Sequence, residues 1–283
     1  MDKNYMGRGL REFIKESALD LIFSSEEKYT FNRLLKELVI RTNAEPIMVR
    51  KLLKELVDEG DLFYTYQYGC SFLERSINKI FSVSERVLLA PAGVSVASGE
   101  KKICVKLERG ASFGTGQHPT TRLSLQAIDW FLDQKDFFDT VSKGIALDIG
   151  TGSGVLAIAA VKFGLHQAIG LDIESISRKE AIENIAINGL SERIQILDKD
   201  INEITGRFSL IMANLRLPTL KHLAAIIRKL ALPGGGLVLS GVKEDEIYGL
   251  RMIYEESGFQ SLRQWIENKW ACLVFIKNGI EGD

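Results

Sequence analysis

Short apolar runs alternate with longer amphipathic stretches through the second half of the chain. The apolar runs predict buried strands at residues 145–149, 168–171, 194–197, 208–213 and 237–241. Helical periodicity and helix-bounding residues predict helices between them, at 120–131, 155–163, 176–188, 219–230 and 243–257. Two further β-prone runs, 259–265 and 271–277, read as a closing antiparallel pair. Strands that alternate with helices indicate an α/β protein with a mostly parallel, doubly wound sheet.

The first 80 residues follow a different pattern. Apolar residues recur at helical spacing over 10–22, 31–39 and 49–57. Thr30 suits a helix N-cap and Pro46 a helix start. An aromatic, β-prone stretch broken by a glycine then predicts a hairpin at 62–72. Three helices followed by a hairpin is the order of a winged helix, so we expect a small winged-helix-like domain.

Residues 81–110 favour a β segment that connects this domain to the α/β part. Strands are predicted at 87–91 and 103–107, on either side of a loop of small and polar residues. A chain of 283 residues is comfortable for two domains. We therefore expect a winged-helix-like domain at 1–80, a β linker segment at 81–110 and an α/β domain at 111–283.

The charge of the N-terminal domain bears on its partner. A winged helix often binds DNA through its third helix, which here offers Arg50, Lys51 and Lys54 beside several acidic residues. Residues 1–80 carry 13 Lys+Arg and 13 Asp+Glu, and the whole chain has a net charge of -1. Phosphate contacts supply most non-specific DNA affinity. The equal numbers of basic and acidic residues argue against nucleic acid binding by this domain, although they do not exclude a local basic face. They favour a domain that docks a protein or packs on the α/β domain.

The cysteines and the hydropathy of the chain indicate its redox environment and its relation to membranes. The three cysteines, Cys70, Cys104 and Cys272, are odd in number and far apart. They suggest neither a disulfide framework nor a metal site, so we expect a reducing cytoplasm and no metal. No apolar stretch approaches the length of a membrane span, and we expect no membrane partner.

The predicted turn after the first α/β strand carries three alternating glycines, Gly150, Gly152 and Gly154. An apolar helix and a second strand follow, and that strand ends at Asp172. Strand, glycine turn, helix, strand and acid form a βαβ nucleotide-binding unit. Glycines let the backbone turn tightly and approach a ligand. An acid at the position of Asp172 can accept hydrogen bonds from both ribose hydroxyls of an adenosine.

The glycine spacing distinguishes between ligands. A dinucleotide site favours Gly-x-Gly-x-x-Gly, which seats a pyrophosphate on a helix N-terminus. This chain has Gly-x-Gly-x-Gly preceded by Asp148, an acid that would repel a pyrophosphate and could pair with a cationic group. S-adenosylmethionine (SAM) carries an ammonium and a sulfonium and no phosphate, so the turn favours SAM. The alternative is a glycine-rich turn of another α/β protein.

Polar residues follow several predicted strands at the same edge of the sheet. They are Gly150, Asp172, Asp198, Asp200 and Asn214. Ligands of doubly wound sheets bind outside the carboxyl ends of the strands, so we expect the ligand at this edge. A second glycine-rich loop, 113–121, lies just before the glycine turn. It fits either a functional loop or a plain turn with a capped helix, and its His118 beside a proline is more typical of a structural role.

Five segments together resemble the PrmA family, whose members methylate amino groups of a large-subunit ribosomal protein. They are 113–121, 148–160, 170–173, 213–215 and 233–241. The resemblance covers roughly 83–277, and the Phe-Gly-Thr-Gly-x-His-Pro-Thr-Thr loop is its specific part. It implies a class I SAM-dependent methyltransferase with a seven-stranded Rossmann-like sheet, SAM as cofactor and a protein substrate, a ribosomal protein in that family.

The resemblance also implies a set of site residues. With the glycine turn, the expected cofactor-binding residues are Thr121, Asp148, Gly150, Gly152, Gly154, Asp172, Ile173, Asp198, Asp200 and Asn214. Asn214 is the candidate that orients the acceptor amine. Phe113 is the second catalytic candidate, either as a cation–π face toward the sulfonium or as a core residue. No strong general base is visible in the sequence.

Two departures from the family pattern leave the acceptor open. The winged-helix-like segment replaces the small α+β substrate-docking domain of the family. Arg216 follows Asn214 and Leu215, where a smaller or aliphatic residue is expected. Alternatives to protein methylation are therefore methylation of RNA or of a small molecule, and a regulator that senses SAM without catalysis. Asn214 and the loop at Phe113 argue against the regulator.

Overall fold

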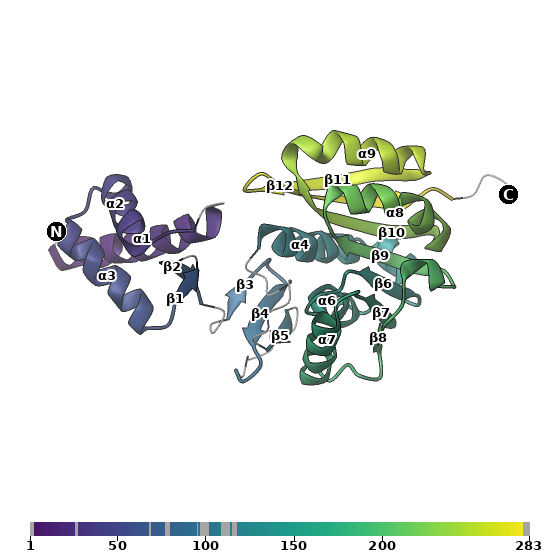
Figure 1. Cartoon of the computed structure of the whole chain (residues 1–283), viewed down its shortest axis with the longest axis horizontal. Coiled ribbons are helices and arrows are strands. Elements are labelled where there is room, and N and C mark those ends of the chain that lie inside the picture. The colour runs from purple at the N-terminus through teal and green to yellow at the C-terminus, as the bar shows by residue number, and fades with distance from the viewer. Residues whose placement is uncertain are drawn as a thin grey trace. The chain divides into compact units, whose positions relative to one another are not determined.

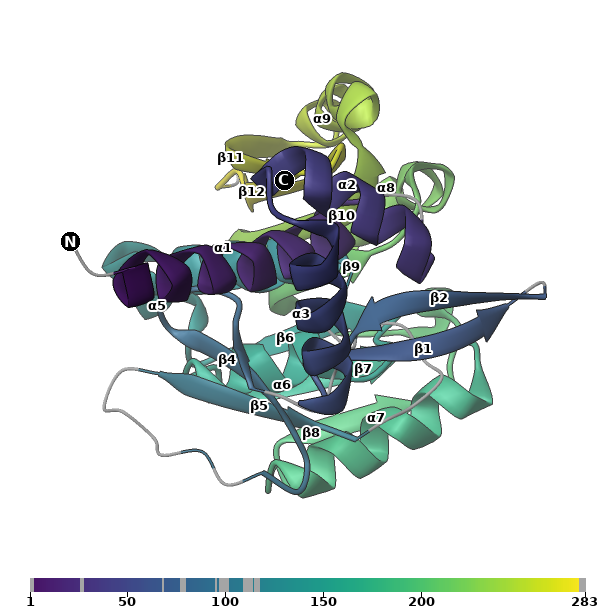
Figure 2. The ribbon, with the colours of Figure 1, turned by 90° about the vertical axis from the view of Figure 1, so that its left-hand side faces the viewer.

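The computed structural model describes residues 3–25, 28–67, 69–76, 80–94, 96, 102–108, 114 and 118–279. The chain divides into two compact units, Met1–Lys79 and Ile80–Asp283. Figure 1 labels most helices and strands of both units, and Figure 2 also labels α5. The segment 81–110, interpreted from the sequence as a linker, belongs to the second unit.

Unit 1 contains three helices and a hairpin, as the periodicity predicts. They are α1 (Lys3–Ser24), α2 (Phe31–Thr42), α3 (Pro46–Asp58), β1 (Leu62–Gln67) and β2 (Cys70–Arg75). The Thr30 side chain caps α2 by accepting a hydrogen bond from the Arg33 backbone N–H, and Pro46 begins α3. The antiparallel β1–β2 hairpin follows α3 (Figure 2). Assignment of this unit to the winged-helix class stays a prediction.

Unit 2 is built on a seven-stranded sheet with the strand order β11-β12-β10-β9-β6-β7-β8. Its strands are β6 (Ile145–Ile149), β7 (Gln167–Leu171), β8 (Ile194–Leu197), β9 (Phe208–Asn214), β10 (Ala231–Lys243), β11 (Phe259–Glu267) and β12 (Trp270–Lys277). Neighbours from β10 to β8 pair in parallel, whereas β12 pairs antiparallel with β10 and β11. The predicted doubly wound, Rossmann-like fold with a closing antiparallel pair is confirmed.

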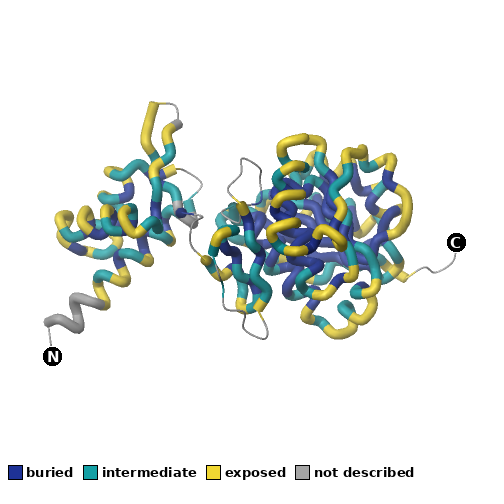
Figure 3. The backbone as a smooth tube through the Cα atoms, turned by 90° about the horizontal axis from the view of Figure 1, so that it is seen from below, coloured by how far each residue is buried: buried dark blue, intermediate teal, exposed yellow. Residues whose placement is uncertain are grey.

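Helices cover both faces of this sheet. They are α4 (Pro119–Asp133), α5 (Lys135–Val141), α6 (Val155–Lys162), α7 (Ser175–Ile187), α8 (Leu217–Leu230) and α9 (Ile247–Glu256). Alternate residues of β9 enter different cores: Leu210 and Met212 pack with α4 and α6, whereas Ile211 and Ala213 pack with α8 and α9. Both faces of the strand are therefore apolar, which explains the continuous runs in the sequence. The buried centre of unit 2 is dark blue in Figure 3.

A small second sheet packs against this framework. It consists of β3 (Phe81–Ser82), β4 (Val87–Pro91) and β5 (Ile103–Leu107), in the order β3-β4-β5. Val87, Leu89 and Val105 are buried in the same core as α4 and α6, which is why this segment joins unit 2. Two asparagines at α7 hydrogen-bond the backbone of β5 and the residue after it. Asn184 Oδ1 accepts from the Glu108 N–H, and the Asn188 side chain accepts from the Lys106 N–H and donates to the Lys106 carbonyl.

Several elements differ from the sequence-based prediction, among them α5, β10 and the two-residue strand β3. Helix α5 is missed, because seven residues directly after α4 are too few for a periodic pattern. Strand β10 begins at Ala231, so it includes the Pro-Gly-Gly-Gly run that favours a turn. The pairing of β10 with β9 shifts register between Ala231 and Gly236, which accommodates that run. No helix among the described residues is both long and apolar enough to cross a bilayer.

Candidate active site

A pocket of about 700 Å³ opens at the carboxyl ends of the central strands of unit 2. Loops after β6, β7, β8 and β9 contribute to it, together with Gly241 of β10, the start of α4 and the start of β12. Its volume suits a nucleoside-sized ligand. The lining residues are His118, Thr120, Ile149, Gly150, Gly152, Leu171, Asp172, Ile173, Glu174, Ser177, Lys199, Asp200, Ile201, Asn214, Leu215, Arg216, Thr219, Leu223, Gly241 and Trp270.

The glycine turn forms the floor of this pocket. The backbone N–H groups of Gly150 and Thr151 both donate to the Leu171 carbonyl at 2.8 Å, which ties β6 to β7 at their ends. Gly150 has a φ of +71°, and a Cβ there would lie 2.7 Å from Cδ2 of Leu215. A side chain at Gly150 would therefore be strained and would displace Leu215 from the pocket wall.

Asp148 holds the glycine turn from behind and does not line the pocket. One carboxylate oxygen, Oδ2, accepts hydrogen bonds from the Thr151 hydroxyl at 2.7 Å and from the Ala157 backbone N–H at 3.2 Å. The other, Oδ1, is buried and has no hydrogen-bond partner within the described part of the chain. Burial raises the pKa of Asp148 to about 6.

Asp172 lies at the end of β7 and faces the pocket. Its Oδ2 accepts a hydrogen bond from the Gly152 backbone N–H at 2.9 Å, and its Oδ1 accepts one from the Glu174 backbone N–H at the same distance. A carboxylate has about four lone-pair positions, so each oxygen retains a position for a ligand hydroxyl. The two backbone bonds fix the orientation of the carboxylate.

The two acids after β8 have different surroundings. Asp198 forms an ion pair with Arg178 at 2.8 Å, and Arg178 also donates to the carbonyl groups of Asp172 and Ile173. Asp200 lines the pocket and accepts hydrogen bonds from the backbone and side chain of Asn202, which lower the pKa of its carboxyl group. Of the two acids after β8, Asp200 lines the pocket and Asp198 does not.

Asn214 ends β9 at the opposite side of the pocket. Its Oδ1 is buried and has no hydrogen-bond partner among the described residues. A buried acceptor without a donor is costly, so the position favours a ligand that donates a hydrogen bond. The Leu215 N–H donates to the Ser240 carbonyl at 3.0 Å, which anchors the residues after the strand.

His118 and Trp270 form the wall next to Asn214. The Nδ1 atom of His118 lies 2.8 Å from the Thr120 hydroxyl, where it caps α4, and the ring contacts Trp270 edge-on at 4.9 Å between centroids. Burial, with the nearby charges of Arg122 and Lys243, lowers the pKa of His118 to about 4. His118 is therefore neutral at physiological pH and a weak base.

The predicted cofactor residues fall into two groups. Those that line the pocket are Gly150, Gly152, Asp172, Ile173, Asp200 and Asn214. Thr121, Asp148, Gly154 and Asp198 do not line it. Thr121 is buried in α4, and its hydroxyl oxygen lacks a hydrogen-bond partner among the described residues. The catalytic candidate Phe113 lies outside the described residues; its neighbour Gly114 accepts a hydrogen bond from the Ser153 hydroxyl at 3.0 Å.

The pocket also contains residues that were not among the expected site residues. Trp270 is the first residue of β12 and belongs to no recognisable motif, whereas Gly241 lies within β10 and ends the segment 233–241 that resembles the family. Leu215 and Arg216 follow Asn214 directly, and their position after a strand could have suggested them. Glu174, Ser177 and Lys199 lie close to predicted acids in the same way.

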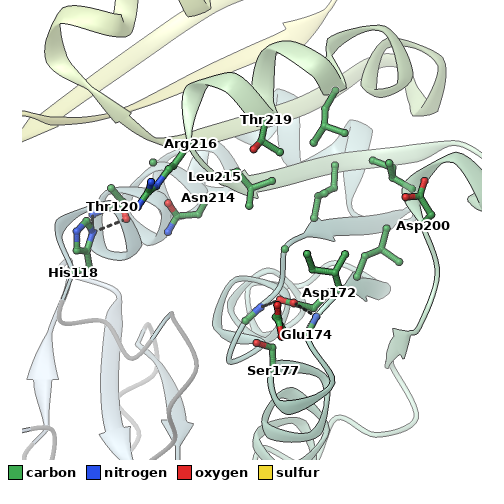
Figure 4. Close-up of a pocket in the computed structure, with 18 of the residues that line it drawn as sticks. His118, Thr120, Asp172, Glu174, Ser177, Asp200, Asn214, Leu215, Arg216 and Thr219 are labelled. Atoms are coloured by element: carbon green, nitrogen blue, oxygen red, sulfur yellow. Dashed lines mark hydrogen bonds between the residues drawn. The ribbon is translucent and has the colours of Figure 1, made fainter.

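Charge is unevenly distributed between the two ends of the pocket. Figure 4 shows Asp172, Glu174 and Ser177 on one side and His118, Thr120, Asn214 and Arg216 on the other. The three carboxylates among the described lining residues, Asp172, Glu174 and Asp200, follow β7 and β8. We name the part around Asp172 and Asp200 the carboxylate end, and the part around His118, Asn214 and Arg216 the cationic end.

Comparisons with known proteins agree with this architecture. Residues 77–278 match the model of the family described as ribosomal protein L11 methyltransferase (PrmA). A relative from Geotalea uraniireducens (strain Rf4), named ribosomal protein L11 methyltransferase, is 31% identical over 197 residues. That alignment covers 68% of this chain and 62% of the relative. One of the same name from Geobacter sulfurreducens is 36% identical over 175 residues, 62% of this chain and 55% of the relative.

A solved structure extends the comparison to the fold. The ribosomal protein L11 methylase of Lactobacillus delbrueckii subsp. bulgaricus superposes with a TM-score of 0.62 at 25% sequence identity. The superposition covers 70% of this chain and 98% of that structure. The chain thus spans less than two thirds of the length of the curated relatives described above, and the match begins at the end of unit 1. This chain belongs to the ribosomal protein L11 methyltransferase (PrmA) family.

Proposed function

We propose that the protein is a SAM-dependent methyltransferase that acts on an amino group of a protein. The main support for the proposal is that Asp172 and Asn214 line the same pocket. Asp172 offers two oriented carboxylate oxygens, as a ribose requires, and Asn214 offers a buried oxygen without a donor among the described residues. The names of the relatives and the match over 77–278 support the same activity.

The residues at the pocket fit SAM better than a nucleotide phosphate. Three carboxylates line the described part of the pocket, and their charge opposes a pyrophosphate. Ile149, Leu171 and Ile201 supply apolar surface near Asp172 and Asp200, which suits an adenine ring. We assign the ribose to Asp172, the adenine surroundings to Asp200 and Ile173, and the backbone approach to Gly150 and Gly152. Thr121, Asp148, Gly154 and Asp198 would support the site from outside the lining.

The proposed catalytic role of this chain's residues is to position the acceptor amine against the methyl group. When bound, SAM supplies a methyl group on a sulfonium, which is already activated for displacement. Asn214 Oδ1 accepts a hydrogen bond from an N–H of the neutral acceptor amine and so directs the nitrogen lone pair toward the methyl group. His118, with a pKa of about 4, stays neutral and borders the acceptor without serving as an effective base. Phe113, the second catalytic candidate, would provide an aromatic face toward the sulfonium.

We propose the methyl acceptor from the names of the relatives. Their names point to a ribosomal protein, which this enzyme would meet in the cytoplasm, and unit 1 would dock that protein. Tritiated SAM added to a lysate from a strain that lacks the protein, together with the purified chain, tests this acceptor. Label in the protein fraction supports the proposal, whereas label confined to RNA or to small molecules contradicts it.

Cofactor binding is tested separately at Asp172. Asp172→Asn removes the charge and replaces one acceptor oxygen, and a hydrogen bond to a charged group contributes about 1.5–3 kcal/mol. Calorimetry should show SAM affinity reduced by about tenfold or more. Asp139→Asn, on the exposed surface of α5, is the matched control and should bind SAM like the wild type. Unchanged affinity in Asp172→Asn would refute the assignment.

A further inference from the structure

Arg216 places a cation at the end of the pocket where the acceptor amine is proposed to bind. It is the residue before α8, it is exposed, and it lines the pocket with Asn214 and Thr219. Figure 4 shows its side chain directed toward Thr120, on the same side as His118. Its position therefore lets it contact the acceptor rather than the adenosine.

No carboxylate of the described residues pairs with Arg216. The carboxylates among the described lining residues follow β7 and β8, at the other end of the pocket. Asp172 accepts hydrogen bonds from the backbone of Gly152 and Glu174, Asp200 accepts one from Asn202, and Glu174 lies two residues after Asp172. Glu267, near the cationic end, bonds the buried Arg122 at 3.1 Å. An arginine that lines a pocket without an acidic partner is suited to bind an anionic group of a ligand.

Other positive charges strengthen this preference. The ammonium of Lys243 lies 3.9 Å from the centroid of the Trp270 ring, which itself lines the pocket. Burial lowers the pKa of His118 most, and the positive charges of Arg122 and Lys243 lower it further, so these two cations act on the same end of the pocket. A lysine acceptor arriving with only its own positive charge would be repelled here. A carboxylate close to the amine removes that repulsion.

We propose that Arg216 is a specificity-determining residue that selects acceptors with a carboxylate next to the methylated amine. The inference rests on the proposed function, because it names the class of acceptor for the same site. Two sources of the carboxylate share this chemistry: an acidic side chain adjacent to the acceptor in a peptide, and the α-carboxylate of an acceptor lysine at the C-terminus of a protein.

Peptide binding in the presence of S-adenosylhomocysteine tests the proposal without turnover. Two synthetic peptides share one lysine and differ only in its neighbours, aspartate in one and asparagine in the other. Fluorescence anisotropy should show that the wild type binds the aspartate peptide about two- to fivefold more tightly, as expected for an exposed charge pair of this kind. Nα-acetyl-lysine and its amide, used as competitors, test the α-carboxylate in the same way.

Three variants make the result decisive. Arg216→Gln should abolish the preference, and Arg216→Glu should reverse it toward a lysine-flanked peptide. Lys221→Gln removes an exposed cation of α8 that does not line the pocket, and it should leave the preference intact. Equal binding of both peptides by the wild type, or a preference that survives in Arg216→Gln, overturns the proposal.

Methyl transfer to the same peptides separates this inference from the proposed function. A binding preference without methylation of any peptide or protein would leave the Arg216 selectivity standing and would reject the enzymatic proposal. Methylation without a binding preference would support the enzyme and reject the role of Arg216.

Discussion

Gly241 lies against the backbone of Leu215, so closely that a Cβ on Gly241 would be 2.5 Å from the Leu215 carbonyl oxygen. Gly241 also has a φ of +89°, which disfavours any other residue. The contact sets the position of Leu215, and with it the adjoining Asn214 and Arg216, at the cationic end of the pocket. A glycine inside β10 thus shapes the site from a neighbouring strand.

Replacement of Gly241 by alanine should lower the free energy of unfolding by more than the cost of its left-handed backbone conformation alone. Gly258 is a matched control, with a φ of +86° and no atom within 4 Å of the position that a Cβ would occupy. Gly258→Ala should lower the free energy of unfolding by about 1–2 kcal/mol, the cost of the left-handed conformation. Gly241→Ala should cost at least about 1 kcal/mol more, because Leu215 must move.

Urea unfolding and SAM calorimetry on both variants measure these effects. We expect SAM affinity to fall in Gly241→Ala and to stay at the wild-type value in Gly258→Ala. Equal losses of stability with unchanged SAM affinity in both would show that the Gly241–Leu215 contact does not shape the pocket.

The buried Asp148 predicts a specific dependence of stability on pH. Its folded pKa of about 6 lies above the ordinary value of 3.8, so the folded state binds the proton more tightly than the unfolded state. The stabilising contribution is therefore complete below about pH 4 and is lost as the pH rises through about 6. The difference between the two pKa values corresponds to about 3 kcal/mol.

Asp148→Asn isolates this contribution, because the amide does not titrate. The free energy of unfolding of the wild type, relative to that of the variant, should decrease between about pH 4 and pH 6 and then level off. A wild-type-minus-variant difference that stays flat across this range would contradict the raised pKa.

Asn214 should affect turnover more than cofactor binding. If its Oδ1 orients the acceptor amine, Asn214→Ala should lower kcat by roughly a hundredfold, the order expected for lost positioning. SAM affinity should change by less than about threefold. Ser177→Ala, at the carboxylate end, should show the opposite pattern. If Asn214→Ala loses activity only in proportion to SAM binding, Asn214 belongs to the cofactor site alone.

Unit 1 is expected to contact a protein rather than duplex nucleic acid. Arg11 and Lys15 of α1 pair with Glu55 and Glu59 of α3, so these charges cancel within the unit. Ile47 at the start of α3 is 82% exposed and available to an apolar partner surface. Ile47→Asp should raise KM for a protein acceptor and leave stability unchanged.

Nucleic acid binding by the full chain provides the opposing test. Arg50, Lys51 and Lys54 are exposed on α3 and would contact phosphates if unit 1 bound DNA. Anisotropy with a labelled duplex at several salt concentrations should show no steep salt dependence. A steep slope that is reduced when Lys51 and Lys54 become Gln would contradict the protein-docking prediction.

Much of the fold follows from local sequence. Continuous apolar runs identify strands buried on both faces, as in β9, and Thr30, Pro46 and Gly154 mark helix starts that the structure contains. The glycine turn and Asp172 are likewise predictable, because tight turns and strand-end acids depend on adjacent residues. What joins them into a pocket is the parallel order of the strands.

Other features depend on contacts distant in sequence. Trp270 reaches the pocket only because β12 pairs with β10, and Asp148 faces inward because Thr151 and Ala157 bind its carboxylate. The division between Asp198 and Asp200 depends on Arg178, which engages Asp198 from α7. These arrangements require tertiary packing, which no local pattern contains.

Mass spectrometry of purified large-subunit ribosomal protein L11, incubated with this chain and SAM, tests the central claim most directly. We predict a mass increase of one or more methyl groups, mapped by fragmentation to an amino group, and loss of that increase with Asp172→Asn. Unmodified protein after incubation, under conditions where calorimetry shows that the chain binds SAM, would contradict it.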